Sequence, residues 1–333
     1  MLRRIKSFVR NGWSAVLKFL AESGFIALEP SAGYLKKYSI MHAGLKRTFK
    51  IYFPEKKENE NLLKPLVIAL HGRGGNGDSM ILLTRNGLNS LADHEGFYVL
   101  YPEGIGMNWN DGRRGEKVND RAHLENIDDT GFISLLIDLM IKDHNTDPGR
   151  VYVTGISNGA IMAFRLACEL SGKIMAIAPV DGSMPENFLH ECTPGNPISV
   201  LAINNTRDPL VPYNGGSIHA GLTRKNLGNV LSVDESINFW VSRNHCNQTP
   251  GEKELPGDNI NNIRVTGKFF FNGMEGTGVV LYTIHGGGHT WPGGLQYLPS
   301  LIIGRTCRTF NANRIIWDFF KHHSKRLQEA MDE

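Results

Sequence analysis

The chain has 333 residues, of which 41% are hydrophobic and 21% are charged, and its formal net charge is +3. This length suffices for one large α/β domain or two small ones, and the composition is typical of a folded globular protein. The small net charge and the lack of a dense Lys/Arg stripe beyond the N-terminus argue against nucleic acid as a partner. No apolar run in the sequence approaches the length of a membrane span.

The pattern of residues 1–30 predicts a basic amphipathic helix, a segment separate from the domain that follows. Lys18 and Glu22 interrupt its apolar stretch, so the segment does not match a signal peptide. We favour a helix that docks on the domain over one that contacts a membrane surface through residues 1–27. The apolar positions at helical spacing are Leu2, Ile5, Val9, Trp13, Val16, Leu17 and Leu20.

From about residue 40 to 325, short apolar runs alternate with helical patterns, which predicts an α/β fold with a mainly parallel central sheet and helices on both faces. A Gly- and Asn-rich stretch at 215–277 is expected to leave the sheet edge as an excursion with one helix and room for a hairpin. The expected strands are 48–53, 66–70, 97–101, 151–154, 175–180, 199–203 and 279–284. The expected helices are 79–93, 130–143, 160–170, 235–243 and 311–330, with Asp128 and Asp129 as N-caps of the second.

The most informative motif is Gly155-Ile156-Ser157-Asn158-Gly159, which follows an expected strand and precedes an expected helix. A serine flanked by glycines at i−2 and i+2 in this setting is typical of a nucleophile elbow. Glycine is needed because side chains at those two positions would collide in so sharp a turn. The alternative is an ordinary glycine-rich turn.

A nucleophilic serine needs a base and an acid that orients the base. Asp208 follows one expected strand and His289 follows the last, so both fall at carboxyl ends of parallel strands, where such sheets carry their sites. Asp181, after the preceding strand, is the rival acid, and His285 is the rival base. With a neutral histidine as base, activity is expected to fall on the acid side around pH ~6–7.

Two backbone N–H groups are expected to form an oxyanion hole. The first is that of Asn158, the residue after the serine, and the second is that of Arg73 in the Gly-rich loop after residue 70. The same loop supports a rival interpretation, because Gly72, Gly74 and Gly77 match G-x-G-x-x-G of dinucleotide-binding folds. In that alternative Glu103 would bind a ribose, although it lies farther along the chain than the usual ~20 residues.

Trp109 and Trp291 are expected near the same edge of the sheet, where they would form aromatic walls for substrate or pack their own loops. The four cysteines, Cys168, Cys192, Cys246 and Cys307, have neither C-x-x-C nor zinc spacing. From the residues alone they could form two disulfides or remain four thiols.

These motifs together resemble the esterase/polyhydroxybutyrate depolymerase family, which includes feruloyl and acetylxylan esterases. The resemblance covers residues 40–320. The matching segments are Leu70-His71-Gly72, Tyr101-Pro102, Trp109-Asn110, Asp128-Asp129-Thr130-Gly131-Phe132, Gly155-Ile156-Ser157-Asn158-Gly159, Asp208-Pro209, Val211-Pro212-Tyr213 and His289-Thr290-Trp291-Pro292.

The resemblance implies an α/β-hydrolase fold, a Ser157, Asp208, His289 triad, a small or oligomeric ester as substrate, and no metal or organic cofactor. A non-catalytic binding protein on the same fold is the alternative function. Many relatives are exported, which would place this protein outside the cytoplasm. Relatives also carry a cysteine that pairs with one like Cys246, but residues 269–273 here contain none, so the resemblance does not predict a disulfide from Cys246, and a pair of Cys168 with Cys192 stays open.

Overall fold

We describe the protein from a computed structural model that covers residues 27–55, 62–114, 118, 120–219 and 226–324. Most of the expected N-terminal helix, residues 1–26, lies outside the described residues, and residues 27–30 are not helical. Within the described ranges, no helix combines the length and apolar character needed to cross a membrane.

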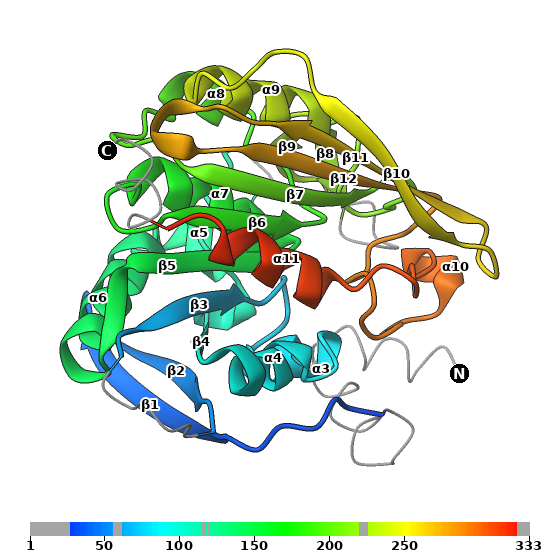
Figure 1. Ribbon diagram of the computed structural model, residues 1–333. Coiled ribbons are helices and arrows are strands. Elements are labelled where there is room, and N and C mark those ends of the chain that lie inside the picture. The colour runs from blue at the N-terminus through cyan, green and yellow to red at the C-terminus, as the bar shows by residue number, and fades with distance from the viewer. Residues whose placement is uncertain (1–26, 56–61, 115–117, 119, 220–225, 325–333) are drawn as a thin grey trace.

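A ten-stranded sheet forms the centre of the molecule, in the order β1-β2-β4-β3-β5-β6-β7-β12-β11-β10 (Figure 1). The strands from β4 to β12 in this order run parallel, whereas the pairs at both ends are antiparallel. This arrangement confirms the predicted α/β fold. The parallel strands are β4 (Tyr98–Pro102), β3 (Lys64–Leu70), β5 (Thr146–Ile156), β6 (Ala176–Val180), β7 (Ser199–Asn205) and β12 (Val279–His285).

The outer strands are β1 (Tyr34–His42) and β2 (Leu45–Phe53) on one side and β11 (Ile263–Phe270) and β10 (Gly251–Asp258) on the other. Of these, only β2 is marked by an apolar run in the sequence. The excursion at 215–277 carries the hairpin of β8 (Gly216–His219) and β9 (Asn226–Val230) and the helix α9 (Val233–Arg243). Its last part, β10 and β11, does not leave the sheet but extends it.

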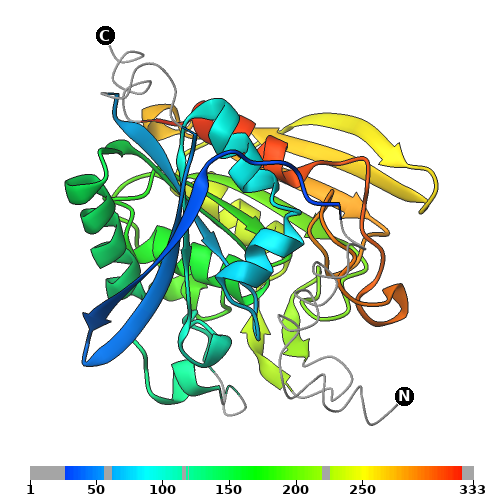
Figure 2. The same ribbon diagram turned by 90° about the horizontal axis from the view of Figure 1, so that it is seen from below.

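Helices cover both faces of the sheet (Figure 1, Figure 2). One apolar core lies between the sheet and α6 (Asp129–Asp143), α7 (Asn158–Glu169) and α9, with Phe132, Met162 and Trp240 among its members. A second core lies on the other face, under α3 (Gly77–Leu83), α4 (Gly87–Glu95) and α11 (Ala312–Lys321). The remaining short helices are α5 (Arg121–Leu124), α8 (Phe188–Glu191) and α10 (Ser300–Ile303), with 3-10 turns η1 (Ile105–Met107) and η3 (Met274–Gly276).

The helix expected at 79–93 is two helices, α3 and α4, separated by a turn. Arg85 and Asn86 in this turn have φ values of 56° and 62°, which no continuous helix permits. The carbonyl groups released at the break are used by distant segments, because Leu295 N–H donates to the Leu83 carbonyl and Asn313 Nδ2 donates to the Thr84 carbonyl. The break therefore anchors the C-terminal part of the chain.

Asp128 and Asp129 have different roles. Asp128 caps α6 as expected, since its carboxylate accepts the Gly131 N–H at 2.8 Å. The expectation for Asp129 was wrong, because its side chain is fully buried and forms a 2.6 Å ion pair with buried Arg47. The same carboxylate accepts the Asn110 N–H at 2.7 Å, so it joins β2, α6 and the loop after β4.

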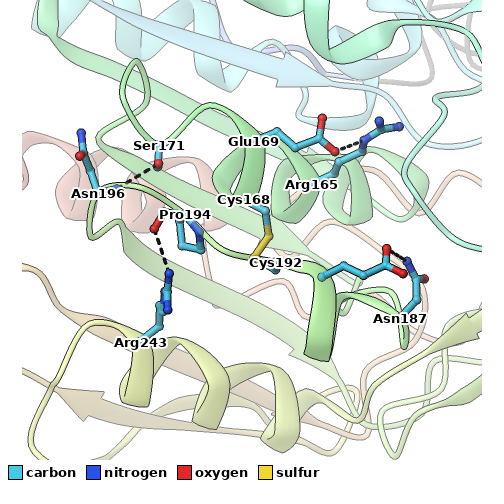
Figure 3. The surroundings of a disulfide bond; sticks show 10 residues. Arg165, Cys168, Glu169, Ser171, Asn187, Cys192, Pro194, Asn196 and Arg243 are labelled. Carbon is cyan, nitrogen blue, oxygen red and sulfur yellow. Dashed lines mark hydrogen bonds and ion pairs between the residues drawn. A yellow bond between two sulfur atoms is a disulfide. The ribbon is translucent and has the colours of Figure 1, made fainter.

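Cys168 and Cys192 form a disulfide, whereas Cys246 and Cys307 are buried free thiols. Figure 3 shows the bridge between the last turn of α7 and the segment that follows α8. A loop of this size makes a disulfide worth about 3 kcal/mol through restriction of the unfolded chain. The sequence left this pairing open, and the structure shows that it forms.

The buried pair of Arg47 and Asp129 leads to a stability prediction. Arg47→Met should lower the free energy of unfolding by about 3–5 kcal/mol, because it leaves the Asp129 charge buried without its partner. The matched control is Arg314→Met, which breaks half-exposed ion pairs with Glu95 and Asp318 and should cost at most about 1 kcal/mol. Urea denaturation of the oxidised proteins measures both, and equal losses would contradict the prediction.

Candidate active site

Ser157 lies in a strained turn between β5 and α7, at the centre of the parallel sheet. Its φ and ψ are 58° and −123°, a conformation that costs on the order of 1–3 kcal/mol for a residue with a side chain. The turn is held from both sides, since Ser157 N–H donates to the Val180 carbonyl and the Ser157 carbonyl accepts the Ile161 N–H. The sequence expectation of an elbow at this residue agrees with the local backbone.

The two glycines of the motif are required by close backbone contacts. A Cβ placed on Gly159 would lie 2.5 Å from the Leu70 carbonyl oxygen, and one on Gly155 would lie 2.8 Å from the same atom. Gly182, after β6, is equally crowded, because its Cβ would lie 2.5 Å from that of Ala160. The start of α7 is therefore pressed against the ends of β3 and β6.

Asp208 and His289 meet at the carboxyl ends of β7 and β12. His289 Nδ1 lies 2.6 Å from Asp208 Oδ2, and both side chains are almost fully buried. The other carboxylate oxygen of Asp208 accepts the N–H groups of Leu210 and Val211 at 2.7 and 2.9 Å, which fixes its orientation. With Nδ1 donating to Asp208, Nε2 of the neutral ring is the nitrogen that can accept a proton.

The charge environment favours the protonated form of His289. Burial by itself lowers the pKa of the ring, but the Asp208 carboxylate and the nearby Asp181 outweigh burial, so the pKa of His289 lies above its ordinary value. The imidazolium that forms when this base takes up a proton is therefore stabilised in place.

Asp181, the rival acid, is buried behind this pair and does not bond to His289. Its carboxylate accepts Asn205 N–H, Asn205 Nδ2 and Thr290 N–H, so it ties the end of β7 to the loop that carries His289. Burial raises the pKa of Asp181, and the charge of Asp208 raises it further. Of the two candidate acids, Asp208 is the one whose carboxylate meets the histidine.

The carboxylates of Asp181 and Asp208 and the ring of His289 also form a group whose ligand atoms lie within 4.8 Å of one another. A cation would need the lone pairs that already accept N–H groups of Asn205, Thr290 and the histidine itself. These groups therefore form a hydrogen-bonded network rather than a set of free metal ligands.

His285, the rival base, lies apart from this network. Its Nε2 is hydrogen-bonded to Thr266 Oγ1 on β11.

The loop that contains Arg73 is held by His71. His71 Nδ1–H donates to the Gly72 carbonyl at 2.8 Å, and Nε2 accepts the Gly104 N–H at 3.0 Å. Burial lowers the pKa of His71 to about 4, which keeps the ring neutral and preserves this pattern of bonds. This role of His71 could not be predicted from the sequence, because it depends on a contact with a residue 33 positions away.

Asn158 is positioned by its own side chain. Its Oδ1 accepts the Trp109 N–H at 2.8 Å, and its Nδ2 donates to the Trp109 carbonyl and, at 2.6 Å, to Asp111. Asp111 is fully buried and also binds Arg113 and His123. These bonds fasten the loop after β4 to the residue that follows the serine, a network that the sequence analysis missed.

Opposite charges in this network keep His123 protonated and Asp111 ionised. Desolvation alone would lower the pKa of His123, but Asp111 and Asp120 raise it to about 9, so the ring is a cation at neutral pH. Burial alone would raise the pKa of Asp111, but Arg113 and His123 hold it well below its usual range. Asp111 therefore remains a carboxylate and can hold Asn158 throughout the neutral range.

Trp109 and Trp291 are both completely buried. Trp109 Nε1 donates to the His71 carbonyl, and Trp291 Nε1 donates to Asn313 Oδ1. Neither indole ring is accessible to a ligand in this structure, so both tryptophans have a packing role, as the alternative interpretation expected.

Glu103, the residue that would bind a ribose in the dinucleotide interpretation, already interacts with protein groups. Its carboxylate accepts a hydrogen bond from the Thr48 hydroxyl and lies 3.7 Å from the Lys50 ammonium group.

The crowding at Gly159 predicts a loss of stability on adding one methyl group. Gly159→Ala would push against the Leu70 and His71 carbonyls, and overpacking of this kind costs about 1–3 kcal/mol. Gly172→Ala is the matched control, because the nearest atom to a Cβ there is 4.0 Å away. Chemical denaturation should show the loss in Gly159→Ala only, and a wild-type stability of that variant would argue against the close approach.

Similar proteins are known. The model of the family Esterase PHB depolymerase matches residues 47–185. Putative esterase NocK from Nocardia uniformis subsp. tsuyamanensis is 31% identical over 261 residues, which cover 77% of this chain and 74% of that protein. Feruloyl esterase B from Piromyces equi is 26% identical over 227 residues, which cover 68% of this chain but only 39% of that protein.

Among solved structures, acetyl xylan esterase from Aspergillus awamori superposes with a TM-score of 0.54 at 17% identity, covering 87% of this chain and 99% of that one. This likeness supports the α/β-hydrolase fold. The sequence matches establish the relationship more closely. The chain belongs to the Esterase PHB depolymerase family of carboxylic ester hydrolases.

Proposed function

We propose that the protein hydrolyses carboxylic esters in two steps, with Ser157 as nucleophile, His289 as general base and Asp208 as the acid that orients it. The observation that carries this proposal is the 2.6 Å bond between His289 Nδ1 and Asp208, formed at the carboxyl ends of β7 and β12, the same edge of the sheet at which β5 ends in the elbow of Ser157. Membership in a family of ester hydrolases supports the reaction type, and these three residues would supply the nucleophile, the base and the orienting acid.

In the first step His289 Nε2 takes the Ser157 proton as the oxygen attacks the ester carbonyl. The tetrahedral oxyanion would be stabilised by the backbone N–H groups of Asn158 and Arg73 and by the N-terminus of α7. Because the Asn158 side chain is fully used in binding Trp109 and Asp111, only its backbone serves the reaction. The imidazolium then protonates the departing alcohol, which leaves an acyl-enzyme.

In the second step water enters by the reverse route. His289 removes its proton, the water oxygen attacks the acyl carbonyl, and the acid is released as Ser157 regains its proton. The second oxygen of Asp208 is held by two backbone N–H groups, so the carboxylate keeps its orientation and holds the imidazole in the required tautomer. Asp181 does not touch the reacting atoms; it positions the loop of His289 through Thr290 and helps to raise the pKa of the ring.

The acyl group is the part of the substrate to be determined. The relatives named above include a feruloyl esterase and an acetyl xylan esterase, and the family name points to hydroxyalkanoate esters. A panel of p-nitrophenyl acetate, p-nitrophenyl butyrate, methyl ferulate and a soluble 3-hydroxybutyrate oligomer separates these classes by their kcat/KM values.

Replacing the nucleophile should abolish this activity. Ser157→Ala is expected to lower kcat on the preferred member of the panel by on the order of 10⁴-fold or more, because triad residues act as a unit. Asp208→Asn should cause a loss of about 10⁴-fold through the wrong tautomer of the base. Asp181→Asn is the matched comparison: a loss as large as that of Asp208→Asn would reassign the acid. Full activity of Ser157→Ala would refute the mechanism, and no turnover by folded wild-type protein would favour a binding role.

The charges around His289 predict the pH dependence. Since the base must be neutral and its pKa lies above the ordinary value, the acid limb of kcat/KM should have its midpoint above the reference pKa of ~6.5. The midpoint of the acid limb is therefore expected at or above the upper end of the range of pH ~6–7 that the sequence predicted. A pH profile measured with p-nitrophenyl acetate tests the shift, and a midpoint well below 6.5 would exclude His289 in this environment as the base.

A further inference from the structure

A polar cleft of about 470 Å³ opens at the edge of the sheet that carries the proposed site. Its lining residues come from the ends of β7 and β12 and from the hairpin of β10 and β11, and Arg264 near the start of β11 lies opposite His285 at the end of β12 in the sheet register. Figure 1 shows this hairpin next to β12. Ile263 is its only large apolar lining residue among those described. The charged and amide side chains that line it are Arg207, Glu254, Asn259, Asn262, Arg264 and His285.

The cleft carries an excess of positive charge. Arg207 and Arg264 share the cleft with a single acid, Glu254, and neither guanidinium donates a hydrogen bond or forms an ion pair with any described residue, Glu254 included. Burial and the charge of Arg264 lower the pKa of His285, so the histidine adds no further cation at neutral pH. Two exposed guanidinium groups without partners are suited to a planar anion such as a carboxylate.

The cleft is connected to the proposed triad through short segments. Arg207 directly precedes Asp208, and His285 begins the loop that ends at His289. The Gly286 N–H donates to Thr206 Oγ1 at 3.0 Å, which joins the two segments at the rim. With strands about 4.8 Å apart, β12 lies roughly 14 Å and β11, which carries Arg264, roughly 19 Å across the sheet from β5, which carries the elbow.

We propose that this cleft binds the free carboxylate end of an oligomeric ester whose scissile carbonyl lies at Ser157. The inference rests on the proposed function and specifies its substrate: a short oligomer of a hydroxy acid, which has one carboxylate terminus and spans the distance from the elbow to the cleft. Binding of the carboxylate would align the scissile ester of the oligomer with Ser157 and lower KM. The carboxylate takes no part in the bond-breaking steps.

The test compares two 3-hydroxybutyrate oligomers of equal length, one with a free carboxyl terminus and one capped as the primary amide. Wild-type enzyme should prefer the free acid in kcat/KM, and Arg264→Gln should lower the acid-to-amide ratio about 10-fold through KM, the size expected for a charge-assisted bond. Lys253→Gln is the matched control, because Lys253 neighbours Glu254 on β10 and points to the opposite face. A ratio near one in wild type would overturn the subsite and leave the esterase proposal intact.

A binding experiment keeps the two proposals separate. Calorimetric titration of Ser157→Ala should detect the free-acid oligomer but not the amide, and Arg264→Gln in the same background should weaken that binding about 10-fold. Equal binding of acid and amide would refute the carboxylate site whatever the activity results. Inorganic phosphate is the third titrant: binding as tight as that of the oligomer would show a general anion site and overturn the substrate role.

Discussion

The close approach of the α7 N-terminus to the end of β3 governs the geometry around Ser157. With only hydrogen at Gly155 and Gly159, the turn after β5 can press against the Leu70 carbonyl, so the nucleophile and the Arg73 loop lie side by side. The same contact seats α7 over the middle of the sheet, where its apolar face joins the core. Local backbone strain at the serine is thus maintained by packing that involves three strands and a helix.

Buried carboxylates then fix the loops around this turn. Asp129 holds the Asn110 backbone, Asp111 holds the Asn158 side chain, and Asp181 holds the loop of His289 through Thr290. Each carboxylate is satisfied by donors from elements distant in sequence, so each positions two segments at once. These bonds hold the loops around Asp208 and His289 in place. The bond between these two residues depends in turn on the alignment of the ends of β7 and β12.

The sequence predicts best what depends on local pattern. The parallel strands have apolar runs, and Ser157, Asp208 and His289 follow such runs directly. By contrast, the partner of Asp129 is 82 residues away, and the break between α3 and α4 is held by Asn313, 229 residues from the carbonyl it binds. The burial of Trp109 and Trp291 likewise follows from bonds to distant residues, and β10 lacks an apolar run because most of its residues are exposed.

The two outermost strands have a consequence for self-association. An open sheet ends in unpaired N–H and C=O groups, which can pair with the edge of a second molecule and begin aggregation. Here β1 carries Lys36 and Lys37, and β10 carries Glu252, Lys253 and Glu254 followed by Pro256. Charged side chains on both edges, with a proline that cannot donate, oppose strand addition. Both edges of the sheet therefore carry side chains that disfavour pairing with the sheet of a second molecule.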